Sequence, residues 1–505
     1  MNSESKASAT HRISAFFCSD FLLILLISIL LLFYLAFING GHNWGDDFAM
    51  YIAHARNIVT GKAYIDTGYI YNPGFPELGP QAYPPIFPLI LSPLIALFGL
   101  NLWALKLAGV VSLSLFLYVF LIKIAPHRLP RVFRILLLLL IGLHPFFGEM
   151  LNNILSDIPF LLICYTTLYL FQFRSNQTER SNNVGLNMLI GFLIYLSYGT
   201  RSIGLSLLAV FFLYEWMLKR RFSKKSWIVI GVSAVGIIIQ SILLPGTGSY
   251  FDQIPHTIPE ALNAWQSLSR IYLGLLPKII PISVLINQKI VLIAFFIPAI
   301  AAFINKMIHR ITVYEVFFLV YSFSLLLWPS FQGLRLLLPL IPLFFLYTVE
   351  GIQLALTVIT NNTVKNFSIV VITCFFVFVF YNYYVTYSHI LQNPSTSDIT
   401  KSSTNELFNF VRQKVSNGET CVFYKPRALA LFTGCRSVAI ESGSYCDVIH
   451  RLKDFDAKYY IVDLRENSEI WSEYAQSAPD TFELVFKNID YQVFRIHYRG
   501  KCLDF

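Results

Sequence analysis

Long apolar segments alternate with short polar connections from Phe21 to Tyr387. The first segment, Phe21–Ile38, is long enough to cross a bilayer, and no small-residue cleavage site follows it, so we expect a retained helix. Further apolar segments follow, and the pattern predicts about eleven transmembrane helices in all. The segments are Phe21–Ile38, Leu102–Ile122, Val132–Phe146, Ile158–Phe173, Leu186–Tyr198, Ile203–Leu218, Trp227–Leu244, Ile290–Ile304, Val313–Trp328, Leu336–Leu356 and Phe367–Tyr387.

The pattern changes near Ser388, where charged residues become dense and the apolar runs become short and alternating. These runs and the turn residues between them predict a small α/β domain. The predicted elements are a strand at Cys421–Tyr424, a helix at Arg427–Thr433, a strand at Lys458–Val462, a helix at Glu469–Gln476 and a hairpin of Phe482–Phe486 and Tyr491–His497. We therefore expect a membrane domain of residues 1–387 and a soluble domain of residues 388–505. The residues after about Ser403 are expected to fold alone and to take no part in the chemistry.

Composition agrees with a membrane protein. Hydrophobic residues make up 55% of the 505 residues and charged residues only 13%, whereas a soluble globular protein carries about 25% charged residues. The formal charge of +9 does not indicate nucleic acid as a partner, because the tail from Ser388 holds 14 basic and 15 acidic residues. The basic excess lies in the membrane part, as expected of basic cytoplasmic loops, and membrane lipids are the expected surroundings.

The basic residues also predict an orientation in an inner (plasma) membrane. With a cytoplasmic N-terminus, the loops on that side hold most of the Lys and Arg residues, and the opposite loops hold only a few. The cytoplasmic set is Lys123, Arg128, Arg131, Arg134, Arg174, Arg180, Lys219, Arg220, Arg221, Lys224, Lys225, Lys306, Arg310 and Lys365. An odd number of spans then places the first outer loop, residues 39–100, on the same extracytoplasmic side as the C-terminal domain.

The cysteines of the tail allow disulfide bonds. Four of the seven, Cys421, Cys435, Cys446 and Cys502, lie in it, and an outer compartment permits disulfides, although their spacing leaves the pairing open. No C-x-x-C spacing occurs. The sequence indicates no metal and no other cofactor, although a divalent ion stays compatible with it.

The first outer loop carries the most unusual polar residues of the membrane part. Asp46 and Asp47 follow the first apolar segment directly, and the corner Tyr83-Pro84-Pro85 lies further along the same loop. Ionisable residues at the end of a span are a functional hypothesis by default. The structural alternative is that both acids are solvated residues at the start of the next helix, where Asp is common.

Other charged residues are predicted at the same membrane face. Glu149 and Asp157 flank the turn between the third and fourth spans, Arg201 lies between the fifth and sixth, and Arg335 begins the tenth. Each has a structural alternative: Asp157 as a helix N-cap, and the arginines as residues that extend to the membrane interface. Acids and arginines gathered at one membrane face favour a functional site, because charges there are usually paired or functional.

Transfer of a sugar from a lipid phosphate requires such a set. The leaving group is already a stable phosphate, so one carboxylate that takes the proton of the acceptor hydroxyl is sufficient. Arginines bind the phosphate, since the guanidinium group contacts it with two donors and keeps its charge. A glycosidase would need two carboxylates with separate roles. The residues therefore favour a transferase.

The order of motifs resembles the GT-C superfamily of polyprenyl-phosphate-sugar glycosyltransferases, which includes protein O-mannosyltransferases and lipid A aminoarabinose transferases. The similar motifs are GDDFAMYIAHARNIVTGK, YPPIFPLILSPLIALFG, His144-Pro145 with Ser156-Asp157-Ile158-Pro159, Thr200-Arg201, and Arg335 to Pro342. The resemblance covers the membrane part and implies a GT-C-like fold with an interfacial helix after Pro84-Pro85. It also implies that Asp46 is the catalytic base.

The resemblance assigns the remaining candidates as well. Asp157 would line the cavity, Arg201 and Arg335 would contact the phosphate, and Tyr83 at the Pro-Pro corner is a further candidate for substrate binding. Asp47 stands where Glu is frequent in the family, so the division of labour between the two acids stays open.

Three functions compete at this point. The first is an inverting membrane glycosyltransferase with a polyprenyl-phosphate-linked sugar donor and a hydroxyl acceptor on an envelope glycolipid, a lipopolysaccharide or a protein. The second is a transporter or flippase of a lipid-linked substrate, although no pair of interrupted helices in matching halves supports it. The third is a membrane-embedded assembly protein. Turnover of a labelled donor separates the first from the other two.

Overall fold

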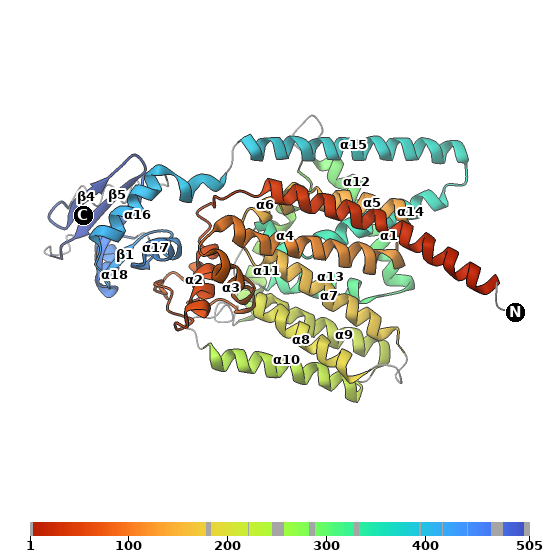
Figure 1. The fold of residues 1–505 in the computed structure, drawn as a ribbon, viewed down its shortest axis with the longest axis horizontal. Coiled ribbons are helices and arrows are strands. Elements are labelled where there is room, and N and C mark those ends of the chain that lie inside the picture. Colours follow the sequence, from red (N-terminus) through yellow and green to blue (C-terminus); the bar gives the residue numbers. More distant parts are fainter. Residues whose placement is uncertain are drawn as a thin grey trace.

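The computed structural model describes residues 4–177, 183–220, 222–244, 257–281, 288–327, 333–392, 395–416, 418–441, 443–465 and 478–498. Over these ranges the chain forms a bundle of long helices and a smaller region with a β-sheet at one end of the bundle (Figure 1). The N-terminus lies at the far end of the bundle from the sheet.

Each of the apolar segments predicted to cross the membrane overlaps one long helix of the bundle, and the segment Val132–Phe146 continues past the end of its helix into the next one. These helices are α1 (Glu4–Phe37), α4 (Leu102–Tyr118), α5 (Arg131–Gly142), α7 (Asp157–Ser175), α8 (Val184–Thr200), α9 (Ser206–Lys219), α10 (Lys224–Leu243), α12 (Gln288–His309), α13 (Val313–Leu326), α14 (Ile341–Val358) and α15 (Asn362–Gln392). Within the described ranges, seven helices are long and apolar enough to cross a membrane, or eight if one bent pair counts as a single span. The chain is thus a multi-span helical membrane protein, with fewer candidate spans in the described ranges than the eleven predicted. Helices α8 and α13 are too short for this criterion, and α7 is not among the helices that meet it.

The bent pair has a local cause. Helix α5 ends at Gly142, and α6 (Pro145–Leu151) continues at an angle of 50°. Pro145 disfavours helical backbone at the preceding residue, and His144 is accordingly extended, with φ −67° and ψ 122°. The ring of His144 then caps α6 by accepting a hydrogen bond from the Phe146 N–H at 3.2 Å.

Buried ion pairs join the helix ends that lie away from the sheet. Arg128 donates to Glu315 at 3.0 Å and also pairs with Glu350. Arg134 pairs with Asp20 at 3.1 Å, and Arg174 pairs with Glu215. Several of the arginines predicted to be cytoplasmic are therefore neutralised inside the bundle, as buried charges require.

Two shorter helices follow α1 and form the first loop. Helix α2 (Asp47–Thr60) ends at Gly61, which is in the left-handed conformation with φ 67°. Helix α3 (Ile86–Phe98) begins directly after Pro84-Pro85 and has 13 residues. At 1.5 Å per residue it is about 20 Å long, which is too short for a bilayer core of about 30 Å.

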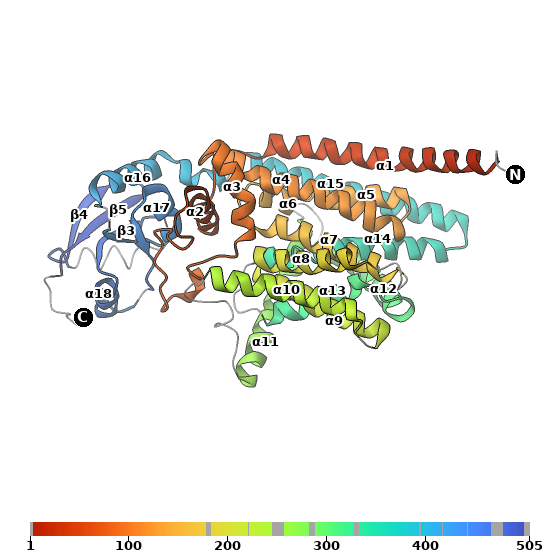
Figure 2. The same cartoon turned by 60° about the horizontal axis from the view of Figure 1, so that its bottom comes forward.

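Helix α11 (Ile258–Leu275) lies between α10 and α12 in the sequence and projects from the bundle (Figure 2). Its apolar residues lie partly in the core, where Leu268, Tyr272 and Leu275 are buried, and partly on the surface, where Leu262 and Trp265 are exposed. A helix with two such faces is typical of an interface position.

The tail forms a five-stranded sheet in the order β2-β1-β3-β5-β4. Its strands are β1 (Thr420–Val422), β2 (Arg436–Val438), β3 (Ala457–Asp463), β4 (Phe482–Lys487) and β5 (Tyr491–Ile496). β1 is parallel to β2 and β3, and β5 is antiparallel to β3 and β4. Its helices are α16 (Ser402–Lys414), α17 (Pro426–Thr433) and α18 (Tyr445–Asp454).

This mixed sheet confirms the predicted α/β character of the tail, including the strands near residues 421 and 458, the helix near 427 and the closing hairpin. Strand β2 and helices α16 and α18 were not predicted. The helix predicted at Glu469–Gln476 lies outside the described residues.

The tail packs closely on the first loop. Tyr69 forms an isolated parallel bridge with Ser437 of β2, and the Ser437 N–H donates to the Gly68 carbonyl at 2.9 Å. One apolar core contains Trp44 and Phe48 of the first loop together with Phe408 of α16. The two regions therefore share buried apolar surface, which the expectation of a separate tail did not include.

Candidate active site

The acid pair lies where the first loop turns into α2. Lys106 of α4 fixes the start of this loop, because its Nζ donates to the carbonyls of Asn39 at 2.8 Å and Gly41 at 2.7 Å. Asp46 precedes α2 with a positive φ of 50°, and Asp47 is the first residue of the helix. Positive φ is uncommon for a residue other than glycine and persists only where surrounding contacts hold it.

Asp46 is buried and incompletely hydrogen-bonded. The residue is 4% exposed, and its Oδ1 accepts the backbone N–H of Ala428 in α17 at 3.0 Å. Its Oδ2 lies 3.8 Å from Arg427 Nε and has no hydrogen-bond partner among the described residues. Burial raises the pKa of Asp46 to about 6, and the Arg427 charge opposes that rise. A carboxylate with a free oxygen and a raised pKa is suited to take up a proton near neutral pH.

Asp47 has the opposite environment. Its Oδ1 accepts from the Tyr83 hydroxyl at 2.7 Å, and its Oδ2 accepts from Arg335 Nη1 at 2.9 Å. Burial alone would raise the pKa of Asp47, but Arg335, Arg427 and the Tyr83 hydroxyl hold it below its usual value. Asp47 is therefore a stable counter-charge.

Asp157 joins the two arginines predicted for the site. It is the first residue of α7 and only 2% exposed, and its Oδ1 accepts from Arg201 Nη1 at 2.6 Å. Its Oδ2 accepts from Arg335 Nη2 at 3.1 Å. The N-cap position belongs to Ser156, so the alternative interpretation of Asp157 as a cap does not describe its side chain.

The arginines are held inside the protein. Arg201 follows α8, and its side chain is 12% exposed, while Arg335 lies in the short 3-10 helix Gly333–Leu337 and is 22% exposed. Both form ion pairs at hydrogen-bond distance with acids from other helices. The alternative of arginines extended to the membrane interface therefore does not fit. Asp46, Asp47, Tyr83, Asp157, Arg201 and Arg335 lie together in one cluster, whereas Glu149 is exposed on α6 and forms none of the ion pairs of this cluster.

A third arginine comes from the tail. Arg427 of α17 is 3% exposed, and its guanidinium carbon lies 4.8 Å from the Tyr69 ring centre and 4.9 Å from the Tyr83 ring centre. Its Nη1 donates to the Tyr83 hydroxyl at 2.5 Å and to Asp47 at 3.4 Å, and its Nη2 donates to the Leu78 carbonyl. The tail therefore contacts the candidate site directly, which the expectation of a separate tail did not include.

One sequence signal pointed to Arg427. It is the single charged residue of the helix segment PRALALFT, whose other residues are mostly apolar. A lone charge on such a helix is expected to be buried against an opposite charge, because an unpaired buried charge is costly.

The neutral side chain of His54 and the hydroxyl of Tyr64 hold the backbone of Tyr83 in place. His54 Nδ1 donates to the Tyr64 carbonyl at 2.8 Å, and its Nε2 accepts the Tyr83 N–H at 3.2 Å. The Tyr64 hydroxyl donates to the Tyr83 carbonyl at 2.8 Å. Burial lowers the pKa of His54 to about 4, so the ring stays neutral and keeps its acceptor nitrogen. Among the described residues, no group of three His, Cys, Asp or Glu side chains is placed to hold a metal ion.

The backbone resembles solved membrane glycosyltransferases. ArnT from Cupriavidus metallidurans, bound to undecaprenyl phosphate, matches with a TM-score of 0.59 at 12% identity, over 96% of this chain and 99% of ArnT. An Archaeoglobus fulgidus oligosaccharyltransferase tethered to an acceptor peptide matches with a TM-score of 0.61 at 11% identity, over 91% of this chain and 71% of that protein. The mycobacterial arabinofuranosyltransferase AftD matches with a TM-score of 0.51 at 12% identity, over 94% of this chain and 41% of AftD.

These matches extend over nearly the whole chain, and they confirm the resemblance to the GT-C superfamily at the level of fold. No protein-family model matches the chain, and no curated protein matches it by sequence. Because the identities are low, the fold is the extent of the likeness.

Proposed function

We propose that this chain is a membrane glycosyltransferase that moves a sugar from a polyprenyl-phosphate donor to a hydroxyl acceptor on an envelope glycolipid, a lipopolysaccharide or a protein. The observation that carries the proposal is Asp46, a buried carboxylate with one free oxygen, in a cluster with three arginines on a GT-C fold. The structural similarity to ArnT bound to undecaprenyl phosphate supports a polyprenyl-phosphate donor.

In the proposed reaction Asp46 is the general base. The acceptor oxygen attacks the anomeric carbon of the sugar, and its proton passes to Asp46 Oδ2. The bond between the anomeric carbon and the phosphate oxygen breaks, and polyprenyl phosphate leaves with the electron pair. Attack from the face opposite the leaving group inverts the anomeric configuration, and the stable phosphate leaving group needs no general acid.

The arginines have a different role in this proposal. Arg201 and Arg335 bind the donor phosphate in this proposal. Before the donor binds, Asp157 holds both arginines in place, because it accepts a hydrogen bond from each. Asp47 anchors Arg335 and Arg427 rather than taking a proton, since its oxygens already accept hydrogen bonds. Tyr83 holds Asp47 and forms part of the substrate site.

We also propose that the end of the bundle with the tail faces the extracytoplasmic side of an inner (plasma) membrane. The support is the set of basic residues at the opposite helix ends, such as Arg128, Arg134 and Arg174, which positive-inside orientation would place in the cytoplasm.

The test uses the full chain reconstituted in lipid vesicles with a set of labelled polyprenyl-phosphate sugars and total envelope lipid as acceptor. We expect release of polyprenyl phosphate together with label on a new acceptor, in the parent and not in Asp46→Asn. Movement of intact donor across the vesicle without transfer would instead support a flippase. The proposal would be overturned if every donor in the set gave neither sugar transfer nor movement across the vesicle.

A further inference from the structure

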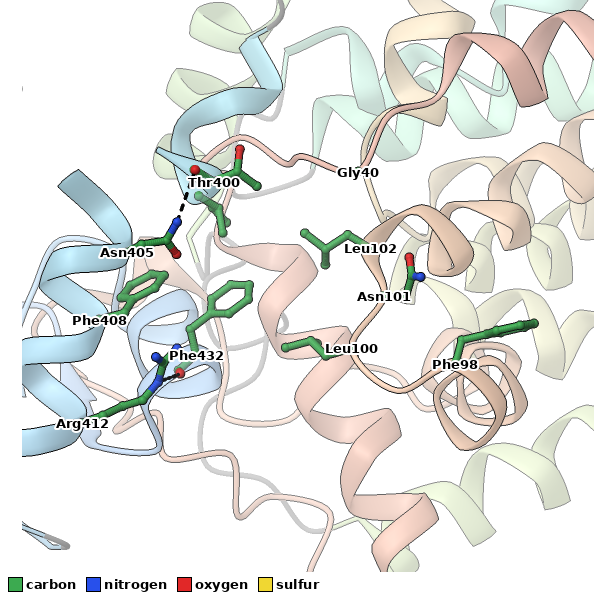
Figure 3. Close-up of a pocket in the computed structure, with 11 residues that line it drawn as sticks. Gly40, Phe98, Leu100, Asn101, Leu102, Thr400, Asn405, Phe408, Arg412 and Phe432 are labelled. Atoms are coloured by element: carbon green, nitrogen blue, oxygen red, sulfur yellow. Dashed lines mark hydrogen bonds between the residues drawn. The ribbon is translucent and has the colours of Figure 1, made fainter. Parts of the chain in front are cut away.

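A groove lies between the membrane part and the tail, outside the acid and arginine cluster. Its volume is about 590 Å³. One wall is formed by the connection between α3 and α4, with Phe98, Leu100 and Leu102, and the other by Phe408 of α16 and Phe432 of α17 (Figure 3). The remaining lining residues are Gly40, Asn101, Ile399, Thr400, Asn405 and Arg412.

The position of the groove is that of a membrane boundary. Gly40 follows the end of α1, and Asn101 caps the start of α4, so the groove lies level with the ends of two spans. Apolar residues continue from it onto the surface, where Leu97 is 75% exposed and Phe98 is 52% exposed. Side chains of this kind are stable at the surface of a membrane protein where lipid chains cover them.

The chemistry of the groove favours an anion with an apolar part. Arg412 is the one charged residue among its lining residues, and it forms no ion pair with a carboxylate among the described residues. Arg412 Nε donates to the Phe432 carbonyl at 3.0 Å and Nη1 donates to Asn409 at 2.8 Å. These two bonds fix the guanidinium at the groove, and Nη2 is free to donate to a phosphate.

We propose that this groove binds an anionic phospholipid of the leaflet next to the tail, with its phosphate on Arg412 and a chain along Leu97, Phe98 and Leu100. The bound lipid joins the membrane surface to α16 and α17 and so stabilises the contact that places Arg427 at the acids. This binding does not depend on the sugar-transfer reaction proposed above.

Native mass spectrometry of the full chain in detergent, titrated with phosphatidylglycerol or phosphatidylcholine, tests the proposal. A charge-assisted contact is worth about 1.5–3 kcal/mol, so we expect phosphatidylglycerol to bind about tenfold or more tightly than phosphatidylcholine. Arg412→Gln should remove this preference, whereas Lys414→Gln, on the same helix but outside the groove, should keep it.

A second variant separates the groove from the charge. Asn405 is an exposed residue at the groove, so Asn405→Trp should fill space there without disturbing the core and should weaken binding of both lipids. Equal affinity for the two lipids in the parent, or an unchanged preference in Arg412→Gln, would overturn the proposal. A melting temperature equal to the parent's shows that each variant is folded.

Discussion

Removal of the Arg427 charge is the most direct test of a site that two regions share. Arg427→Gln keeps a donor for the Leu78 carbonyl and removes the cation 3.8 Å from Asp46. Two unit charges about 4 Å apart attract by about 4 kcal/mol at an effective dielectric constant of about 20. One unit of pKa corresponds to about 1.4 kcal/mol, so loss of the Arg427 charge should raise the pKa of Asp46 by about one to three units. The acidic limb of the pH–activity profile should move to higher pH by the same amount.

The direction of this shift follows from the pKa of Asp46, the proposed base. Burial already raises the pKa of Asp46 to about 6, and Arg427 opposes that rise, so its loss leaves more of the base protonated at pH 7. We expect turnover at pH 7 to fall about two- to a hundredfold, according to the size of the shift, and to recover as the pH is raised. Arg427→Lys keeps a charge and should shift the limb less.

The assay is the pH dependence of kcat/KM with a saturating acceptor, measured for Arg427→Gln, Arg427→Lys and a control. Arg436→Gln is a matched control, because Arg436 is exposed on the neighbouring strand β2. The proposed effect of Arg427 on the pKa of Asp46 would be refuted by an acidic limb of the pH profile that stays in place in Arg427→Gln. A loss of kcat/KM of equal size at every pH would refute it as well.

Four other predictions remain: three concern the same cluster, and the last concerns the orientation in the membrane. Asp46→Asn should lower turnover by about 10²–10⁴-fold while donor binding persists; normal turnover would place the base elsewhere, with Asp157 the next candidate. The same variant should be more stable than the parent above pH 6. The Asp46 carboxyl has a pKa of about 6 in the fold and 3.8 ordinarily, so the parent loses about 3 kcal/mol of folding stability as the pH rises through that window. A melting temperature of Asp46→Asn at pH 7.5 that is not above the parent's would contradict this. Arg335→Lys keeps the charge but loses the planar fork that contacts Asp47 and Asp157 together, so donor affinity should fall about tenfold or more; donor affinity equal to the parent's in both Arg335→Lys and Arg201→Ala would exclude the phosphate role. A reporter fused after Phe505 should be active only outside the cytoplasm, and activity inside would contradict the proposed orientation.

Much of the helical bundle could be predicted because the bilayer imposes a simple rule. A span needs about 20 apolar residues, and each of the eleven segments found by that rule overlaps a helix, of which seven or eight meet the criterion for a candidate span. The grouping of Asp157, Arg201 and Arg335 could also be predicted, since charges at one membrane face are expected to pair. What the rule does not give is which acid pairs with which arginine, because that depends on helix rotation and packing.

The contribution of the tail could not be predicted for a physical reason. Its docking on the first loop depends on apolar contacts such as Trp44 with Phe408 and Phe48 with Phe432, between residues more than 350 positions apart. No periodicity within one segment reports such contacts. Helix α16 was missed although Leu407, Phe408 and Val411 have helical spacing, since the polar residues around them resemble a linker.

The environments of the two adjacent acids differ, and this difference supports the division of labour that we propose for them. Two neighbouring carboxylates would repel each other, and a protein that uses one as a base must make them different. Here Asp47 accepts hydrogen bonds on both oxygens and has a lowered pKa, while Asp46 has one free oxygen and a raised pKa. The difference is set by distant elements: Arg335 stabilises the charge on Asp47, and α17 of the tail supplies the N–H and the guanidinium beside Asp46. The tail therefore belongs to the acid–base chemistry we propose, because its position determines how readily Asp46 takes a proton.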